Sequence, residues 1–162
     1  MIEPIRVQLI ADTPDVIPIL ANWYKGAWPD WFIDTPLAEI ENDFRCVANR
    51  DHLPLALAAY NGTSQLLGAC SIRDDPFASY PSAGPWLRGL YVHPPFRGQG
   101  IAGAMIRAAE QYASLLCISR LYASTHSAIG TFERAGWLGF DQVMHDGQKL
   151  TIFAKRIDEF RK

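Results

Sequence analysis

The chain has 162 residues, 49% apolar and 20% charged, and its formal net charge is −2 at pH 7. This length suffices for one hydrophobic core, and the small net charge excludes the strongly basic surface of most proteins that bind nucleic acid or anionic lipid. No apolar run approaches the roughly 20 residues of a membrane helix, and the N-terminus lacks the basic and apolar regions of a secretory signal. We therefore expect a cytoplasmic protein with no nucleic-acid and no membrane partner.

The cysteines agree with a cytoplasmic location. Cys46, Cys70 and Cys117 are odd in number and scattered, which is typical of reduced thiols rather than of a disulfide framework. Neither these residues nor the four histidines have the spacing of metal ligands. We expect no metal.

The N-terminal segment predicts one strand followed by two helices. Apolar and polar residues alternate from residue 5 to residue 9, as in a half-buried strand. Asp12 or Thr13 can cap a first helix and Thr35 a second, and a proline follows in both places. Residues 26–34, between the two helices, are rich in aromatic side chains and contain two aspartates.

A hairpin and a long loop come next. Leu55–Tyr60 and residues 66–72 are apolar runs, and the Asn-Gly pair between them is a strong hairpin signal. Residues 74–85 are polar and predict a loop, which carries Phe77 and Tyr80.

Residues 86–116 predict a strand, a glycine-rich loop and a helix, in that order. The strand ends in the strand formers Leu90, Tyr91 and Val92, and the two prolines that follow cannot continue a ladder. The helix has one apolar stripe at spacings of three and four residues, made of Ile101, Met105, Ala108, Tyr112 and Leu115.

The junction between this loop and this helix is suited to bind an anion. The N–H groups in the first turn of a helix have no partner inside the helix, and the macrodipole makes that end positive. Glycines let an anion approach the backbone closely, and an arginine adds a full positive charge. The residues at the junction are Arg97, Gly98, Gln99, Gly100, Ile101 and Ala102.

Two common phosphate motifs do not fit the junction. The P-loop pattern is absent. Gly98, Gly100 and Gly103 match the dinucleotide pattern, but residues 93–97 stand where that motif needs a tight turn. The next strand also ends, at residues 123–125, without an acid for a ribose.

The rest of the chain predicts a strand, a short helix and a closing hairpin. The strand covers residues 118–124, the helix residues 127–135, and the hairpin turns at Asp146-Gly147. The predicted element order is therefore β-α-α-β-β-β-α-β-α-β-β.

The segment R-G-Q-G-I-A resembles the R/Q-x-x-G-x-G/A signature of the GNAT superfamily of acyl-CoA-dependent N-acyltransferases, with matches at Arg97, Gly100 and Ala102. The preceding LYVHPPF resembles the central strand and loop of that family, and the element order is similar to its fold. The resemblance implies an α/β (α+β) fold with a mixed, mostly antiparallel sheet of about seven strands and helices on both faces. It also implies a single N-acetyltransferase domain over residues 1–162.

In that family the segment binds the pyrophosphate and pantetheine of acetyl-CoA. The resemblance implies the same co-substrate here, with the diphosphate at residues 97–102 and the pantetheine beside main-chain groups of Leu90, Tyr91 and Val92. The family's central strand carries a bulge; Gly89 either marks this bulge or fills a packing gap in the strand. His93 is expected on the cofactor side of the loop.

A second family segment contains an Asn, an Ala and then Tyr-Glu-Lys-x-Gly-Phe. Here Thr125 stands at the Asn position and Phe132 at the Tyr position, and the resemblance implies that both border the cofactor. The family's Tyr protonates the leaving thiolate, but Phe132 has no proton to give. Tyr122 and His126 are nearby in sequence and are the candidate acids. The central strand lacks the Glu that many family members use there as a base.

The acceptor amine is expected between the first two helices, the loop at residues 74–85 and the closing hairpin. Trp28, Trp31 and Tyr80 are candidates for aromatic walls, which suit a cation, and Asp30 for its charge partner. The predicted function is transfer of an acetyl group from acetyl-CoA to a primary amine of a small molecule, by direct attack in a ternary complex, in a monomer or homodimer. Two alternatives stay open: a non-catalytic acyl-CoA sensor, and an acetyltransferase that acts on a protein N-terminus or lysine.

Overall fold

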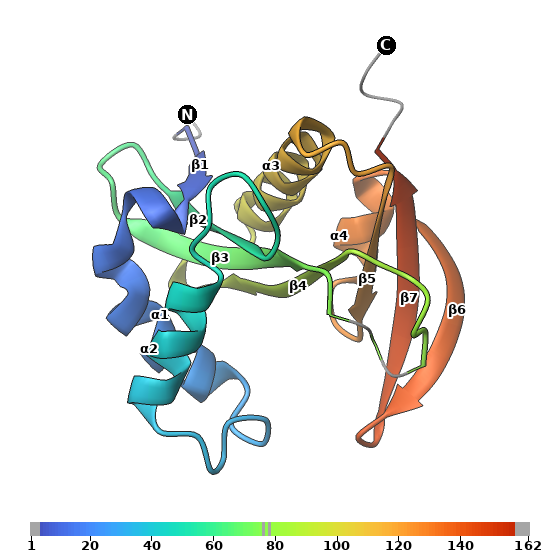
Figure 1. The fold of residues 1–162 in the computed structure, drawn as a ribbon, viewed down its shortest axis with the longest axis horizontal. Helices are drawn as coiled ribbons and strands as arrows, with labels where there is room; N and C mark the ends of the chain where they lie inside the picture. Colours follow the sequence, from blue (N-terminus) through green and yellow to red (C-terminus); the bar gives the residue numbers. More distant parts are fainter. Residues whose placement is uncertain (1–3, 76, 78, 158–162) are drawn as a thin grey trace.

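A seven-stranded sheet forms the centre of the computed structural model, which describes residues 4–75, 77 and 79–157. Its strands are β1 (Arg6–Leu9), β2 (Leu55–Tyr60), β3 (Leu66–Arg73), β4 (Trp86–Val92), β5 (Arg120–Thr125), β6 (Leu138–His145) and β7 (Gln148–Arg156). Their order across the sheet is β1-β2-β3-β4-β5-β7-β6 (Figure 1). Neighbouring strands are antiparallel except β4 and β5, which are parallel.

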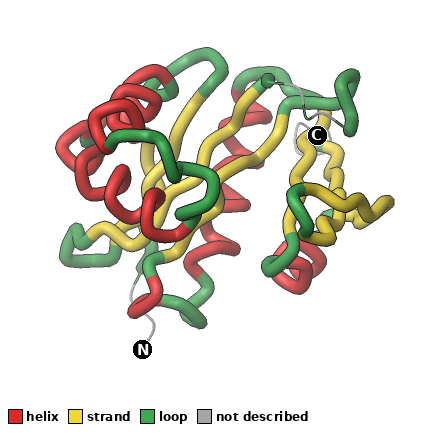
Figure 2. The backbone as a smooth tube through the Cα atoms, turned by 90° about the horizontal axis from the view of Figure 1, so that it is seen from below, coloured by secondary structure: helices red, strands yellow, loops and turns green. Residues whose placement is uncertain are grey.

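Helices cover both faces of this sheet (Figure 2). The buried side chains of α1 (Ile17–Ala27) and α2 (Leu37–Cys46) pack with Tyr91 in one core. Those of α3 (Ile101–Leu115) and α4 (Ile129–Arg134) pack in a second core on the other face. The predicted fold class and element order are confirmed.

The position of each strand explains its sequence. β2 is buried at every position, because helices cover both of its faces, and it reads as a continuous apolar run. β6 lies at the edge of the sheet, and most of its side chains are exposed.

Both predicted hairpin turns are present. Asp146 and Gly147 join β6 to β7 with φ values of 49° and 78°, the left-handed pair that a tight two-residue turn requires. In the turn between β2 and β3, the Asn61 side-chain oxygen accepts hydrogen bonds from the N–H groups of Thr63 and Gln65.

The starts of the first two helices differ from the prediction. Two short 3-10 turns, η1 (Ile10–Asp12) and η2 (Pro14–Val16), precede α1, and no side chain caps it. The Thr13 hydroxyl instead bonds the hydroxyl of Tyr60 on β2. Pro36 is the N-cap of α2, so Thr35 stands one residue too early to cap that helix.

Within the described ranges, no helix is long and apolar enough to cross a membrane. Nor does any group of three or more His, Cys, Asp or Glu side chains there have an arrangement that suits a metal ion.

Candidate active site

A β-bulge interrupts β4. In the pairing of β3 with β4, Gly89 and Leu90 both stand opposite the single residue Cys70. Gly89 has a φ of 62°, a left-handed conformation that glycine adopts readily. Gly89 therefore marks a bulge, the first of the two alternatives that the sequence left open.

Tyr24 of α1 holds this bulge from the helical side. Its hydroxyl donates a hydrogen bond to the Gly89 carbonyl. Burial raises the pKa of the Tyr24 phenol well above its ordinary value, so the hydroxyl keeps its proton at neutral pH. A Cβ at position 89 would lie 3.1 Å from the Tyr24 ring, so this contact also favours glycine.

β4 and β5 separate just beyond their first contact. In this fully described part of the sheet, Trp86 and Tyr122 are the one residue pair in register between the two strands. The Tyr122 N–H also donates to the Pro85 carbonyl at 3.0 Å. Residues 87–92 therefore have no strand partner on the β5 side (Figure 1). We call this interruption of the ladder the β4–β5 opening, and the bulge borders it.

The loop after β4 enters α3 through two left-handed glycines. After the 3-10 turn η3 (Pro94–Phe96), Gly98 and Gly100 have φ values of 79° and 81°. Apart from each glycine and its two chain neighbours, no described atom lies within 4 Å of the positions that their Cβ atoms would occupy. Gly100 is the N-cap of α3, and among the residues that the structure describes no side chain bonds the first N–H groups of that helix. The loop therefore offers backbone donors to a ligand.

Arg97 adds positive charge beside these donors. Its Nε donates to the Val92 carbonyl at 2.8 Å, and its guanidinium carbon lies 5.9 Å from the centre of the Tyr91 ring. These contacts keep the exposed guanidinium near the end of β4. Its terminal nitrogens have no acceptor in the described part of the chain and remain available to an anion.

Aromatic side chains form two clusters on the α1–α2 face of the sheet. The α1 cluster consists of Trp23, Tyr24, Trp28, Tyr91 and His93. The hairpin cluster consists of Phe77, Tyr80, Trp86, Tyr122, Phe140 and His145. Leu87 and Leu121, which alternate with Trp86 and Tyr122, lie in the core on the α3 side, so these two rings point to the opposite face.

The region that contains the bulge, the loop and α3 matches a known family. The sequence profile of the Acetyltransferase (GNAT) family matches residues 17–137. The chain belongs to the GNAT family of acetyltransferases. A search of curated protein sequences found no match.

Solved GNAT structures share the fold. Spermidine N-acetyltransferase from Vibrio cholerae, solved with CoA and spermine, has a TM-score of 0.77 at 12% identity, and the match covers 98% of each chain. The yncA protein from Salmonella typhimurium, solved with its cofactor acetyl-CoA, has a TM-score of 0.72 at 16% identity, over 96% of this chain and 95% of that one. An aminoglycoside 6'-N-acetyltransferase complexed with coenzyme A has a TM-score of 0.72 at 14% identity, over 94% and 97%.

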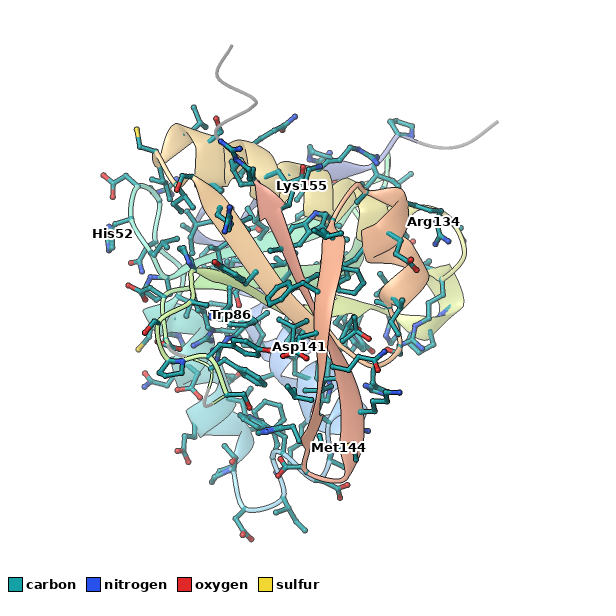
Figure 3. All side chains as sticks on the ribbon, turned by 90° about the vertical axis from the view of Figure 1, so that its right-hand side faces the viewer. His52, Trp86, Arg134, Asp141, Met144 and Lys155 are labelled. Atoms are coloured by element: carbon teal, nitrogen blue, oxygen red, sulfur yellow. The ribbon has the colours of Figure 1, made fainter. Side chains whose placement is uncertain are left out.

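In this GNAT protein, the four residues expected around the acceptor lie in different parts of the structure. Trp28 belongs to the α1 cluster, and Tyr80 belongs to the hairpin cluster, where its hydroxyl bonds the Asp141 carboxylate. Asp141 lies on β6, the edge strand of the sheet (Figure 3). Asp30 and Trp31 lie in the turn between α1 and α2, and 66% of Trp31 is exposed. The sequence pattern could not distinguish the rings that face the sheet from those that face solvent.

The residues of the second GNAT segment have structural partners. Phe132 is buried, with its ring 5.0 Å from that of Trp137 and 5.4 Å from that of Phe153. The Thr125 hydroxyl oxygen accepts a hydrogen bond from the Ala128 N–H at 2.9 Å, which organises the start of α4. In the described part of the chain, the Thr125 hydroxyl proton has no acceptor and can be donated to a ligand.

The two candidate acids lie in different surroundings. Tyr122 lies where β4 and β5 last pair, with its ring 5.4 Å from that of Trp86 and 6.4 Å from that of Phe140. It is half-buried on the face that carries the aromatic clusters. His126 is exposed in the turn between β5 and α4.

His93 does not lie on the cofactor side of the loop, where the sequence analysis placed it. Its ring stacks on Trp23 of α1, with centroids 3.9 Å apart and planes at 6°. Its Nδ1 is 3.1 Å from the Tyr91 hydroxyl. Residues two apart in extended chain share a face, so His93 follows Tyr91 toward α1.

Sequence reasoning missed Tyr24, Arg73 and Arg88. Tyr24 is indistinguishable from other apolar-stripe residues until α1 is seen against the bulge. Arg88 had a usable signal: it is a charged residue inside an apolar strand, two residues after Trp86 and therefore on the same face.

Proposed function

We propose that this protein transfers the acetyl group of acetyl-CoA to a primary amine of a small molecule by direct attack in a ternary complex. The observation that carries the proposal is the β4–β5 opening, bordered by a glycine bulge and followed by a loop with free donors. Family membership supports the reaction type. We also propose that residues 1–162 form a single acetyltransferase domain.

The loop fits the diphosphate of coenzyme A. Gly98 and Gly100 adopt φ values that other residues reach only with strain, and the space beside them is open. Backbone N–H groups and a guanidinium are the donors that bind phosphate oxygens best. The proposed diphosphate ligands are Arg97, Gly98, Gln99, Gly100, Ile101 and Ala102.

The unpaired edge of β4 fits the pantetheine arm. Leu90, Tyr91 and Val92 can offer it the main-chain groups that β5 leaves without a partner, and Thr125 and Phe132 would border it from the other side. Acetyl-CoA, when bound, supplies an acetyl thioester. A main-chain N–H at the bulge is the kind of fixed donor that stabilises negative charge on a thioester oxygen.

The cysteines support direct transfer without an acyl-enzyme. Cys70 stands opposite the bulge, but its side chain belongs to the core on the α3 side. Burial raises the pKa of the Cys70 thiol to about 12, so the nucleophilic thiolate is scarce at neutral pH. Cys46 ends α2, and Cys117 follows the C-terminal end of α3, opposite the glycine loop. The acceptor amine is therefore the proposed nucleophile.

Contacts of the loop at residues 74–85 support a small acceptor rather than a protein. The Tyr80 hydroxyl bonds Asp141 of β6. The Phe77 ring lies 5.3 Å from Trp86 and 5.5 Å from His145. These contacts link the described part of the loop to the β6–β7 hairpin, across the face where an extended peptide would need an open groove.

An assay of free thiol, run with acetyl-CoA and a panel of small amines and lysine-containing peptides, tests this proposal. We expect thiol release with at least one small amine and mass gain of one acetyl group on that amine. Binding of acetyl-CoA without thiol release from any acceptor would favour the sensor alternative. Release with peptides alone would favour the protein acetyltransferase.

A further inference from the structure

Two arginines lie side by side on the face of the sheet that carries the aromatic clusters. Arg73 ends β3 and Arg88 lies in β4, where their strands pair. Ile72 and Leu87, which alternate with them, belong to the core on the α3 side. Both guanidiniums therefore project from the opposite face, toward α1 and the hairpin cluster.

Both arginines contact Asp75, Arg73 through the side-chain carboxylate and Arg88 through the main-chain carbonyl. An Nη of Arg73 is 3.7 Å from the Asp75 carboxylate, and an Nη of Arg88 donates to the Asp75 main-chain carbonyl at 2.9 Å. The Nε of Arg73 also donates to the Ser71 hydroxyl at 3.3 Å. Asp141, another acid bordering the hairpin cluster, bonds the Tyr80 hydroxyl. The group formed by Arg73, Arg88 and Asp75 thus carries one positive charge in excess.

Arg88 is the better placed of the two to bind a ligand. It is half-buried, and in the described structure one of its N–H groups has a protein acceptor, through the single bond to Asp75. Partial removal from water lowers the pKa of the Arg88 guanidinium, and Arg73 lowers it further, while Asp75 raises it. An anion placed between the arginines would relieve this repulsion and use the free donors.

The arginines border the bulge. Arg88 directly precedes Gly89 in β4. Arg73 is close enough to the Tyr24 phenol to act on its pKa, and that phenol bonds the Gly89 carbonyl. Positive charge therefore lies next to the main-chain groups that are proposed to hold the thioester.

We infer that the acceptor is a primary amine that also bears an oxyanion close to its nitrogen, as an amino acid or an aminophosphonate does, and that Arg88, assisted by Arg73, binds this oxyanion. The inference rests on the proposed function. The guanidinium fork matches the two oxygens of a carboxylate or phosphonate and fixes the orientation of the molecule. Tyr122, which is half-buried on the same face with its ring against that of the buried Trp86, offers apolar surface to the remainder of the acceptor.

This inference narrows the proposed acceptor, a small primary amine, to one that also carries an oxyanion. A bare cation would need an unpaired carboxylate near the bulge, whereas Asp75 contacts Arg73, Asp141 bonds the Tyr80 hydroxyl, and Asp30 lies in the exposed turn between α1 and α2. The charge nearest to the bulge is that of arginines. An anion-bearing amine meets this charge favourably, whereas a polyamine is repelled by it.

Matched acceptor pairs test the inference by binding and by turnover. L-Phenylalanine, L-methionine and L-leucine are each compared with the amine that lacks only the carboxylate, and 1-aminoethylphosphonate is compared with ethylamine. Titrations of the CoA-saturated protein give Kd and the shifts of the arginine Nε–Hε signals in NMR spectra, and free thiol gives kcat/KM. We expect at least one oxyanion-bearing member to bind tenfold or more tightly than its partner and to shift the Arg73 and Arg88 signals. A phosphonate preferred over every carboxylate would identify the oxyanion without changing the inference.

Variants assign the preference to the arginines. We expect Arg88→Gln to abolish the preference and Arg88→Lys, which keeps the charge without the fork, to retain part of it. Arg45→Gln, at an exposed position of α2, should leave it unchanged. Thermal unfolding of each variant confirms that it folds.

The outcomes separate this inference from the proposed function. If bare amines bind and react as well as their oxyanion-bearing partners, or if Arg88→Gln keeps the preference, the inference fails and the acetyl transfer stands. If oxyanion-bearing amines bind through Arg88 but no thiol is released, the transfer fails and the inferred ligand class stands. If nothing binds and nothing reacts, both fail.

Discussion

The bond between Tyr24 and Gly89 fixes the direction of the main-chain groups at the bulge. The change Tyr24→Phe removes this bond and keeps the ring contacts with Phe44 and Trp28, at 5.0 and 5.1 Å. A hydrogen bond of this kind contributes about 1 kcal/mol, so we expect kcat to fall roughly fivefold to tenfold while the KM for acetyl-CoA changes little. Steady-state thiol release measures both constants. Tyr112→Phe, in the core on the α3 side, is the matched control, and an unchanged kcat for Tyr24→Phe would contradict the positioning role.

Phe132 stands at the position that the resemblance assigns to the family's usual acid, and we propose that Tyr122, half-buried where β4 and β5 pair, replaces it. General acid catalysis contributes roughly 10²–10⁴-fold, and a thiol with an ordinary pKa near ~8.5 depends on it least. We therefore expect Tyr122→Phe to lower kcat by about 10²-fold. His126→Ala should leave kcat unchanged. The opposite result would assign the acid to His126, and an unchanged kcat in both variants would exclude a side-chain acid at either position.

Among the secondary-structure elements, the glycine loop before α3 is the one at which a reversal of charge should weaken acetyl-CoA binding most. Arg97→Glu removes one guanidinium and places a carboxylate beside the proposed diphosphate. We expect acetyl-CoA to bind at least tenfold more weakly, about 1.4 kcal/mol, and isothermal titration calorimetry measures this directly. Arg45→Glu on α2 makes the same charge change away from the loop and should leave the affinity unaltered. Equal affinities for both variants would show that the diphosphate binds elsewhere.

A buried ion pair links α3, α4 and β7. The Glu110 carboxylate of α3 is 2% exposed, lies 2.7 Å from Nζ of Lys155 on β7, and accepts a hydrogen bond from the Trp137 indole N–H at 3.3 Å. Nζ of Lys155 also donates to the Ala135 carbonyl at the end of α4, at 2.7 Å. The pair therefore fixes the helix that carries Phe132.

Lys155→Met leaves the Glu110 carboxylate buried without its cation. We expect the free energy of unfolding to fall by about 3 kcal/mol, because an uncompensated buried charge costs more than the pair contributes. The double variant Glu110→Gln with Lys155→Met should recover part of this loss. Denaturant unfolding measures each value, and a double variant less stable than the single one would contradict this explanation.

The elements were predictable from the sequence because each has a local cause. Strands and helices followed from periods of two and 3.6 residues, and the turn residues between them required particular φ values, as Gly98 and Gly100 show. The predicted helix caps were wrong because a threonine hydroxyl can bond any suitable partner that the fold brings near it. For Thr13 that partner is Tyr60, which is 47 residues away in sequence.

In the molecule as a whole, the order of the strands in the sheet decides which side chains reach the site. This order cannot be predicted from local sequence patterns. Arg73 and Arg88 meet because β3 and β4 pair beneath α1, and Tyr24 reaches Gly89 across 65 residues of sequence. The sequence could therefore predict the conformation of the glycine loop, which is one continuous segment, and the role of that loop in cofactor binding stays a prediction. On the acceptor side, Asp30 and Trp31 stand in an exposed turn, and the charge near the bulge comes from two arginines whose proximity no local pattern reveals.

The central claim is that the acetyl thioester binds in the β4–β5 opening with its diphosphate on the loop before α3. A crystal structure of the acetyl-CoA complex tests this claim most directly. We predict diphosphate density within hydrogen-bond distance of the N–H groups of residues 98–102, and the acetyl oxygen on a main-chain N–H of residues 90–92. Density for the nucleotide at another surface, or a thioester distant from the bulge, would contradict the account.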